Sequence, residues 1–227
     1  MSRPVLILRP EPGNAATVVQ ANLQGLSAVG YPVFEIEAVE WAAQLPSTYE
    51  AVLLTSANSV FHSRSGLETY RHLPVYAVGS ATAKAARAAG LMVKAEGSLG
   101  VDALLARVQP KKLLHLAGED ATQLSPHSHI IDQVAVYRSC PIVPSPPFWA
   151  ILEQAPIALL HSARAATYFR GLTKSAKIDR ISIVAISAKV AMAAGSGWEA
   201  VALAAHPRDE AMIDAAIEMA AKHDRVV

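Results

Sequence analysis

The sequence is poor in cysteine, in net charge and in long apolar runs. Cys140 is the single cysteine among 227 residues, which excludes an internal disulfide and a cysteine-rich metal site and favours a reducing compartment, so we expect a cytoplasmic protein. The formal net charge is +1, so no general field attracts nucleic acid. No stretch approaches the roughly 20 apolar residues that a membrane span needs, so we expect no membrane partner.

The sequence also lacks the common motifs of phosphate, nucleotide and metal sites. It contains no Walker glycine–lysine loop, no complete dinucleotide fingerprint, no hydrolase nucleophile elbow and no His-Glu-x-x-His helix. His127-Ser-His129 is the one tight histidine pair, and no acidic or thiol partner accompanies it. We interpret it as solvated surface and expect no metal site.

What the sequence does contain is an internal repeat. Leu53-Leu-Thr-Ser-Ala-Asn-Ser-Val-Phe61 reappears with small changes as Leu159-Leu-His-Ser-Ala-Arg-Ala-Ala. Tyr76-Ala-Val-Gly-Ser-Ala is echoed, at nearly the same offset, by Val184-Ala-Ile-Ser-Ala-Lys. Because hydrophobic residues make up 52% of the chain, two cores can be filled. The repeat predicts two similar α/β lobes, and a cleft between lobes is a natural ligand site.

Short apolar runs alternate with alanine-rich helical stretches, which is typical of parallel sheets covered by helices on both faces. The predicted buried strands are Val5–Leu8, Val52–Leu54, Val75–Val78, Leu113–Leu116, Ile157–Leu160 and Ile183–Ile186. The predicted helices are Ala15–Val29, Ser59–Tyr70, Thr82–Ala89, Asp102–Val108, Ala165–Leu172, Lys189–Ala194 and Glu210–Lys222.

Three segments break this alternation. Val33–Val39 alternates apolar and polar residues, and Val134–Arg138 does so less cleanly. Such alternation suits an exposed antiparallel pair better than a buried parallel strand. Pro141 to Pro147 contains four prolines and is predicted to be a loop or an extended connector.

Small polar residues follow four of the predicted strands, two in each repeat. They are Thr55, Ser56 and Asn58; Ser80 and Thr82; Ser162 and Arg164; and Ser187 and Lys189. Turns at the carboxyl edge of a parallel sheet bind ligands, and the helix N-termini that follow suit anions. Helix capping alone explains any single turn equally well. Four such turns together favour a shared site for a polyanion.

Two further residues are candidates by position. Arg9 follows the first strand at the same edge, where a guanidinium can pair with a carboxylate, although a solvated strand-end arginine is an equal alternative. Tyr137 lies in the predicted connector, where a phenol near a cleft can assist a leaving hydroxyl. On pattern alone, an aromatic residue packed at a hinge is the better interpretation of Tyr137. His115 and His161 are interpreted as histidines satisfied at strand edges.

Taken together, these residues resemble the uroporphyrinogen-III synthase family. The motifs that carry the resemblance are Leu6-Ile-Leu-Arg-Pro10, Leu54-Thr-Ser-Ala-Asn-Ser-Val60, Tyr76-Ala-Val-Gly-Ser-Ala-Thr-Ala83, Val136-Tyr-Arg138, Leu160-His-Ser-Ala163 and Ala204-Ala-His-Pro with Ala211-Met-Ile213. Each motif is short, and their order and spacing are more specific than any one of them. The resemblance implies two α/β lobes joined by a two-stranded antiparallel ladder. It implies a discontinuous first lobe of residues 1–36 and 138–227, an inserted lobe of residues 40–133, and a ladder of residues 33–39 and 134–138.

The resemblance implies an enzyme that takes the linear tetrapyrrole hydroxymethylbilane, removes water, inverts ring D and closes the macrocycle without a metal or organic cofactor. We expect a monomer in which Tyr137 assists loss of the hydroxyl group. Thr82 matches a threonine of a family turn, and Thr55, Ser56, Ser162 and Ser187 match turn positions that contact substrate carboxylates.

The sequence departs from the family pattern at two places. Val190 stands where many relatives have a threonine, with Lys189 beside it, and the strand ending in His115-Leu-Ala-Gly118 lacks a common arginine. The alternatives are therefore an inactive paralogue, or a two-lobed protein that binds an anionic small molecule without catalysis.

Overall fold

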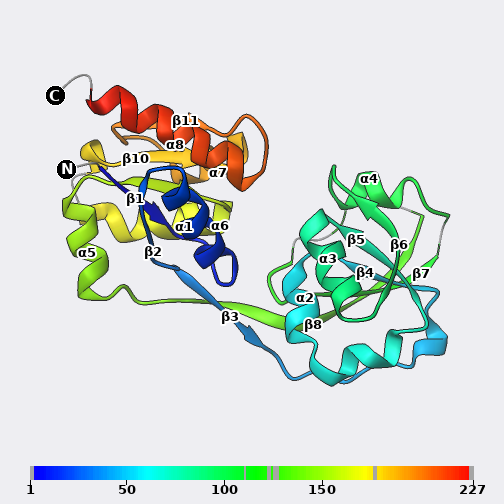
Figure 1. Cartoon of the computed structure of the whole chain (residues 1–227). Helices are drawn as coiled ribbons and strands as arrows, with labels where there is room; N and C mark the ends of the chain where they lie inside the picture. The colour runs from blue at the N-terminus through cyan, green and yellow to red at the C-terminus, as the bar shows by residue number, and fades with distance from the viewer. Residues whose placement is uncertain (1–2, 110, 122–123, 125–127, 176–177, 225–227) are drawn as a thin grey trace. The chain divides into compact units, whose positions relative to one another are not determined.

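The chain forms two compact units in the computed structural model, which describes residues 3–109, 111–121, 124, 128–175 and 178–224. The terminal unit comprises Met1–Glu35 and Pro141–Val227, and the central unit comprises Ile36–Cys140 (Figure 1). The chain therefore leaves the terminal unit once, builds the central unit and returns.

The terminal unit is built on a five-stranded sheet in the order β11-β10-β9-β1-β2. Its neighbouring strands pair in parallel. The strands are β1 (Pro4–Ile7), β2 (Ser27–Gly30), β9 (Ile157–Leu160), β10 (Ser182–Ala185) and β11 (Ala200–Leu203). Every residue of β1, β9 and β10 is buried, which is why these strands are continuous apolar runs in the sequence.

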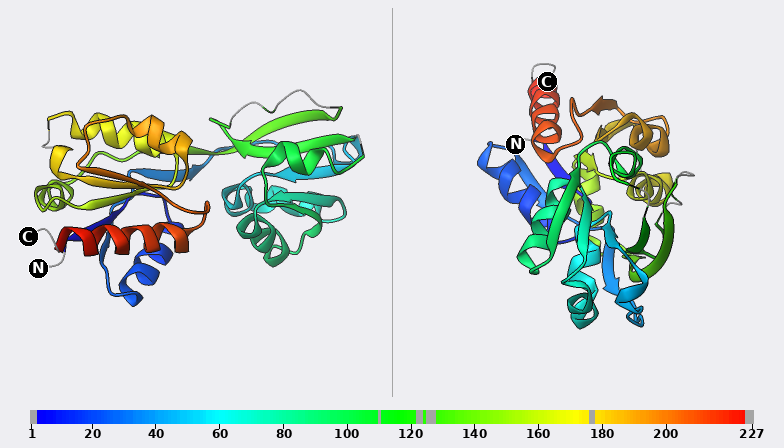
Figure 2. Two further views of the ribbon diagram at one scale, coloured as in Figure 1. Left: turned by 90° about the horizontal axis from the view of Figure 1, so that it is seen from above. Right: turned by 90° about the vertical axis from the view of Figure 1, so that its right-hand side faces the viewer.

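Helices cover both faces of this sheet (Figure 2). One face packs against α1 (Gly13–Leu23) and α8 (Asp209–Asp224). The other packs against α5 (Pro146–Glu153), α6 (Ala163–Leu172) and α7 (Ala188–Ala194), with Phe169 and Trp198 stacked in that core. Short 3₁₀ segments occupy Thr173–Ser175 and Ile178–Arg180.

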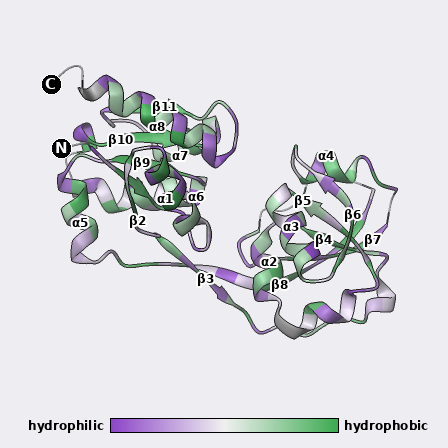
Figure 3. Ribbon diagram, in the orientation of Figure 1, coloured by the Kyte–Doolittle hydropathy of each residue, from purple (hydrophilic) through white to green (hydrophobic). Residues whose placement is uncertain are grey.

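The central unit is built on a six-stranded sheet in the order β3-β8-β7-β4-β5-β6. The strands are β3 (Phe34–Ala38), β4 (Ala51–Leu54), β5 (Pro74–Val78), β6 (Met92–Gly97), β7 (Lys112–Gly118) and β8 (Ile130–Pro141). The helical segments are α2 (Ala57–His62), α3 (Ser80–Ala88), α4 (Val101–Leu105) and the 3₁₀ segments Pro46–Thr48 and Arg64–Tyr70. α2 and α3 cover one face and α4 the other. The strands that run through each core are predominantly hydrophobic in Figure 3.

Strands β3 and β8 carry the chain between the units and pair with each other. The Val39 backbone N–H donates to the Val136 carbonyl, and the Ile142 N–H donates to the Val33 carbonyl. The residue numbers increase along β3 while those of the paired residues in β8 decrease, so the pairing is antiparallel. The predicted fold class, two parallel-sheet lobes joined by an antiparallel pair, is confirmed. The sequence pattern predicted β8 only as a strand of the antiparallel pair. In the structure β8 also pairs in parallel with β7, from Ile130 to Tyr137, so it belongs to the central sheet as well.

Several predicted element bounds were wrong for identifiable reasons. The helix predicted over Ala15–Val29 ends at Leu23, because Gly25 adopts φ +86° and the chain turns into β2. The helix predicted over Ser59–Tyr70 divides into α2 and a 3₁₀ segment. The proline-rich connector ends where α5 begins at Pro146, a first-turn position that tolerates proline.

Three strands of the structure, β2, β6 and β11, were not predicted from the sequence. β6 and β11 lie at sheet edges and alternate exposed with less exposed residues, so they lack the continuous apolar run by which a buried strand is found.

Candidate functional site

The central sheet reverses its strand order between β4 and β7. From β4 the chain adds β5 and then β6 on one side, and it returns to place β7 on the other side. In open parallel sheets, ligands bind at the carboxyl ends of the strands beside such a reversal. Thr55 and Ser56 follow β4, and Asp120 and Ala121 follow β7, so both turns lie at this position.

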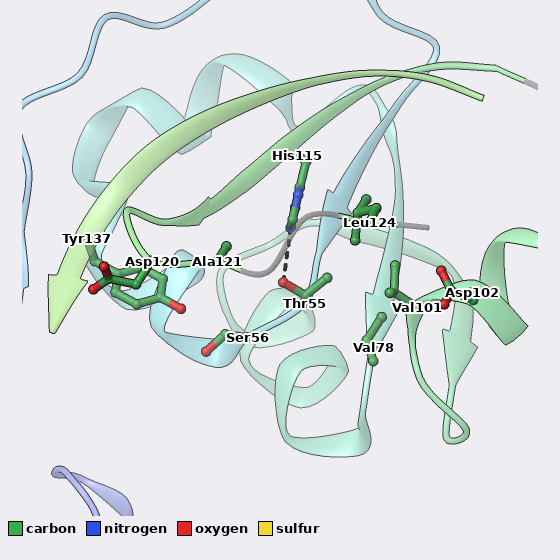
Figure 4. Close-up of a pocket in the computed structure, with 10 residues that line it drawn as sticks. All are labelled: Thr55, Ser56, Val78, Val101, Asp102, His115, Asp120, Ala121, Leu124 and Tyr137. Atoms are coloured by element: carbon green, nitrogen blue, oxygen red, sulfur yellow. Dashed lines mark hydrogen bonds between the residues drawn. The ribbon is translucent and has the colours of Figure 1, made fainter. Parts of the chain in front are cut away.

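A cavity of about 470 Å³ opens at this edge of the central sheet (Figure 4). Its polar lining consists of Thr55, Ser56, Asp102, His115, Asp120 and Tyr137, and its apolar lining consists of Val78, Val101, Ala121 and Leu124. Among the described lining residues there are two carboxylates and no lysine or arginine. It therefore offers hydroxyl groups, acidic acceptors and apolar surface rather than a cluster of positive charge.

Thr55 is held by His115 from the middle of β7. Thr55 Oγ1 lies 3.0 Å from His115 Nε2, and the His115 side chain is only 1% exposed. Burial lowers the pKa of His115 to about 4. His115 is therefore neutral near pH 7, and the Thr55 hydroxyl stands between a fixed imidazole and the open cavity.

Tyr137 reaches the same cavity from β8. The side chain is partly buried, and its ring lies 6.2 Å from the His62 ring between centroids. In Figure 4 the phenol oxygen is turned toward the space that Ser56 borders. The structure thus brings together three predicted site residues from two separate segments: Thr55, Ser56 and Tyr137.

Three other predicted residues of the central unit, Asn58, Ser80 and Thr82, are not among the described residues that line this cavity. Ser56 caps α2, where its Oγ accepts a hydrogen bond from the Asn58 backbone N–H at 3.2 Å. Ser80 is exposed at the start of α3, whereas Thr82 is buried within the same helix. Ser56 therefore serves as a cap and as a cavity residue at once.

The terminal sheet has an equivalent reversal between β1 and β9, and a polar cluster fills it. Arg9 follows β1, and its Nη1 lies 2.7 Å and 2.5 Å from the two carboxylate oxygens of Asp209. The Thr17 hydroxyl donates to Asp209 Oδ2 at 2.7 Å, and His161 Nε2, at the end of β9, lies 3.4 Å from Oδ1. An added Cβ on Gly13 would lie 2.5 Å from Arg9 Nε, so the glycine leaves room for the guanidinium.

The surroundings of Asp209 and His161 shift the pKa values of both side chains. Burial by itself would raise the pKa of Asp209, but His161, the Thr17 hydroxyl and the Arg9 charge together lower it to about 2. Burial also lowers the pKa of His161, and Asp209 opposes that shift. The cluster is an internal example of a carboxylate bound by a guanidinium and a hydroxyl at the carboxyl edge of a strand.

The remaining predicted residues of the terminal unit follow β9 and β10. Ser162 is exposed and caps α6, with its Oγ accepting from the Ala165 N–H at 3.1 Å. Ser187 precedes α7 without such a side-chain bond, and Lys189 is exposed. The Arg164 guanidinium lies 4.8 Å from the centre of the Phe34 ring.

Sequence reasoning did not propose six polar residues of these two clusters as site residues: Thr17, Asp102, His115, Asp120, His161 and Asp209. His115 was interpreted as a satisfied strand histidine, and the three aspartates gave no pattern. The available signal for Asp209 was its place: the loops ending at Gly100 and at Arg208 precede matching helices, and an aspartate lies in the first turn of each helix, Asp102 in one and Asp209 in the other.

Among the described residues, no group of three or more histidine, cysteine or acidic side chains is arranged to hold a metal ion. His127 lies outside the described residues. The interpretation of His129 as solvated surface was wrong: its side chain is buried, its Nδ1 accepts a hydrogen bond from the Lys111 backbone N–H at 3.2 Å, and its Nε2 lies 3.1 Å from the Leu105 carbonyl oxygen. None of the described helices has both the length and the apolar character required to cross a bilayer.

Comparisons with known proteins place these features in context. A family model described as uroporphyrinogen-III synthase HemD matches residues 16–214. A structure of uroporphyrinogen-III synthetase from Helicobacter pylori is similar, with a TM-score of 0.69 at 18% identity over 96% of this chain and 99% of that one. A mutant uroporphyrinogen III synthase from Thermus thermophilus gives a TM-score of 0.55 at 16% identity over 98% and 100%. No curated protein matches the chain. At these identities the structures show a shared fold, and the family match covers most of the sequence.

Proposed function

The chain belongs to the uroporphyrinogen-III synthase family, and on that premise we propose how its residues perform the family's reaction. The reaction cyclises hydroxymethylbilane with loss of water and inversion of ring D, so the chain is a cyclising lyase of tetrapyrrole biosynthesis. The observation that carries the site assignment is the cavity at the reversal of the central sheet, which Tyr137, Thr55 and Ser56 line together. Neither a non-catalytic binding protein nor an inactive paralogue is favoured by the comparisons.

Tyr137 is the proposed acid. As the bond from the hydroxymethyl carbon to its oxygen breaks, the phenol transfers its proton to the departing oxygen, which leaves as water. The proton that the adjacent pyrrole N–H releases as this carbon becomes electrophilic restores the phenol. General acid assistance of this kind typically contributes 10²- to 10⁴-fold. The substrate closes by itself to the uninverted isomer, so the main task of the protein is to hold the chain with the inverting carbon of ring D in position to attack.

The proposed cavity ligand is a pyrrole ring of the substrate. Its flat apolar faces suit Val78, Val101 and Leu124, and its N–H suits an acidic acceptor such as Asp102 or Asp120. The carboxylates of the substrate are bound better by hydroxyl groups and helix N-termini than by this acidic and apolar lining. We therefore propose that the turn residues of both units bind substrate carboxylates: Arg9, Thr55, Ser56, Asn58, Ser80, Thr82, Ser162, Arg164, Ser187 and Lys189.

The proposal also covers the domain organisation, compartment, oligomeric state and cofactor requirement of this enzyme. We propose that the two compact units act as the two lobes of the enzyme, with residues 33–39 and 134–138 as the connecting ladder. We further propose a cytoplasmic monomer that requires no metal or organic cofactor and binds no nucleic acid.

The activity test uses freshly prepared hydroxymethylbilane and separation of the two uroporphyrinogen isomers. The purified protein should produce mainly isomer III, whereas the blank produces isomer I. Isomer I alone would overturn the proposed activity, and binding of the substrate without turnover would favour the non-catalytic alternative.

Changing Tyr137 to phenylalanine tests the acid. Tyr137→Phe removes the hydroxyl and keeps the ring, so the fold should persist while kcat falls by about 100-fold, the lower end of general acid effects. Single-turnover rates and circular dichroism measure the two properties. A variant that folds and keeps the wild-type rate shows that Tyr137 is not the acid.

A further inference from the structure

The ring of Tyr137 lies directly over a glycine of the neighbouring strand. An added Cβ on Gly118, the last residue of β7, would lie 2.7 Å from Tyr137 Cε2, 2.8 Å from Cζ and 3.1 Å from the phenol oxygen. We infer that Gly118 is a positioning residue for the reaction: it leaves the space in which the Tyr137 ring must lie for its hydroxyl to reach the cavity. This inference rests on the acid role proposed for Tyr137.

The backbone itself does not require glycine at this position. Gly118 is not among the glycines with positive φ, so an alanine can adopt its conformation. Within a strand, a glycine weakens the sheet and often marks a close approach of other atoms. The atoms that approach Gly118 are those of the Tyr137 ring, and the space they fill is the physical reason for the glycine.

An irregularity in β8 places Tyr137 opposite this glycine. Ala117 pairs with Ala135, but Gly118 pairs with Tyr137, so Val136 is an extra residue on β8. Val136 is fully buried in the core of the central unit. Such a bulge re-aims the side chain beside it, and here it turns the Tyr137 ring across the gap that Gly118 provides.

Contacts on either side of Tyr137 hold this arrangement. The Glu119 N–H donates to the Tyr137 carbonyl at 2.9 Å, which fixes the backbone next to the glycine. The Arg138 guanidinium binds Glu37 Oε2 through Nε at 3.0 Å and Nη2 at 2.8 Å, which ties the following residue to β3. Because the backbone is held on both sides, an added methyl group on Gly118 must be relieved by movement of the tyrosine ring.

Gly118→Ala is the direct test. The displaced phenol should lower kcat by about tenfold or more, because a misplacement near 1 Å can cost about 100-fold. The substrate-binding groups are unchanged, so KM should change little, and the share of isomer I in the product should rise. A crystal structure of the variant should show the Tyr137 ring shifted from its wild-type position. A ring in its wild-type position together with an unchanged kcat overturns the inference.

Gly66→Ala is the matched control. A Cβ on Gly66 would lie 2.5 Å from Cζ2 of Trp41, so this change also forces an alanine against an aromatic ring of the central unit. Neither residue lines the cavity. The control should lose stability and keep the wild-type kcat of its folded fraction. An equal fall of kcat in both variants would show general distortion and overturn the positioning role.

A double variant, Tyr137→Phe with Gly118→Ala, tests the positioning role of Gly118 separately from the acid role of Tyr137. In a Tyr137→Phe background, Gly118→Ala should cause no further loss of kcat, because no hydroxyl remains to be positioned. Losses that multiply would overturn the inference. If Tyr137→Phe alone keeps the full rate, the proposed acid role fails, and the ring position in the Gly118→Ala structure still decides whether the glycine sets the tyrosine.

Discussion

His115 is a buried histidine of the central unit, and it belongs to the cavity rather than to the core alone. Its imidazole is buried, neutral and in contact with Thr55, so it can hold that hydroxyl without carrying charge. A protonated imidazole at this position would be a buried charge with little to compensate it. His115 therefore links the binding surface to the stability of the fold.

The pH dependence of stability follows from this burial. The pKa of His115 falls from an ordinary 6.5 to about 4 on folding, so the unfolded chain binds its proton first as the pH drops. The free energy of unfolding is therefore unaffected by protonation of His115 above pH 6.5 and decreases progressively as the pH falls toward 4. Near pH 4.5 the loss should reach about 2 to 3 kcal/mol.

His115→Gln tests that sign and that size. The glutamine amide keeps a hydrogen-bonding group near Thr55 and does not titrate, so the variant should lose less stability than the wild type between pH 7 and pH 4.5. Urea denaturation at several pH values measures the difference. His161 shifts in the same direction and remains in both proteins, so part of the acid sensitivity should persist. Parallel curves for the two proteins would contradict the assignment.

At the scale of the element, the strand-to-helix turns serve two purposes that can be separated. Ser162 and Ser187 occupy corresponding places after β9 and β10, but only Ser162 accepts a capping hydrogen bond through its side chain. The sequence predicted both as substrate-binding residues and also offered capping as the alternative. The structure shows that the alternative is at least part of the role of Ser162.

Alanine substitutions at these two serines should therefore differ in stability. Ser162→Ala should cost about 1 kcal/mol, the usual value of an N-cap, and Ser187→Ala distinctly less. Urea denaturation measures this cost, and KM for hydroxymethylbilane measures carboxylate binding separately. A rise of KM in both variants supports the binding role. An unchanged KM in both would leave capping as the only role of Ser162 and would remove both serines from the proposed site.

The elements that could be predicted from sequence are those with a local cause. Buried strands such as β1 and β4 are continuous apolar runs, and the turn after Gly79 follows from a glycine with φ +86°. β6 and β11 have no comparable signal, because an edge strand is held by one neighbour that lies elsewhere in the sequence. The bulge at Val136 is also invisible in the sequence, because it is a relation between two strands.

At the scale of the whole molecule, the repeat corresponds to two separate hydrophobic cores. Leu53 of β4 and Leu159 of β9 occupy the same place in the repeated motif, and each is fully buried in a cluster of its own unit. The two clusters share no residue. Loss of either side chain is therefore a local event in the first instance.

Native-state hydrogen exchange should reveal this division. Leu53→Ala should lower amide protection in Ile36–Cys140, and Leu159→Ala should lower it in the terminal unit, each by about 2 to 5 kcal/mol, the usual cost of truncating a buried leucine. Each variant serves as the control for the other. Equal loss of protection in both units from either change would show that they unfold as one body.

The sequence by itself determined the class of fold, the repeat, the family and the identity of most polar turn residues, because each of these leaves a local or repeated pattern. The tertiary structure alone decided which of those residues meet. It joined Tyr137 to Thr55 and Ser56, added His115 from a neighbouring strand, and paired Arg9 with Asp209, nearly the whole chain apart. Such meetings depend on sheet order and strand register, which arise from pairing between distant segments and not from the residues on either side of each position.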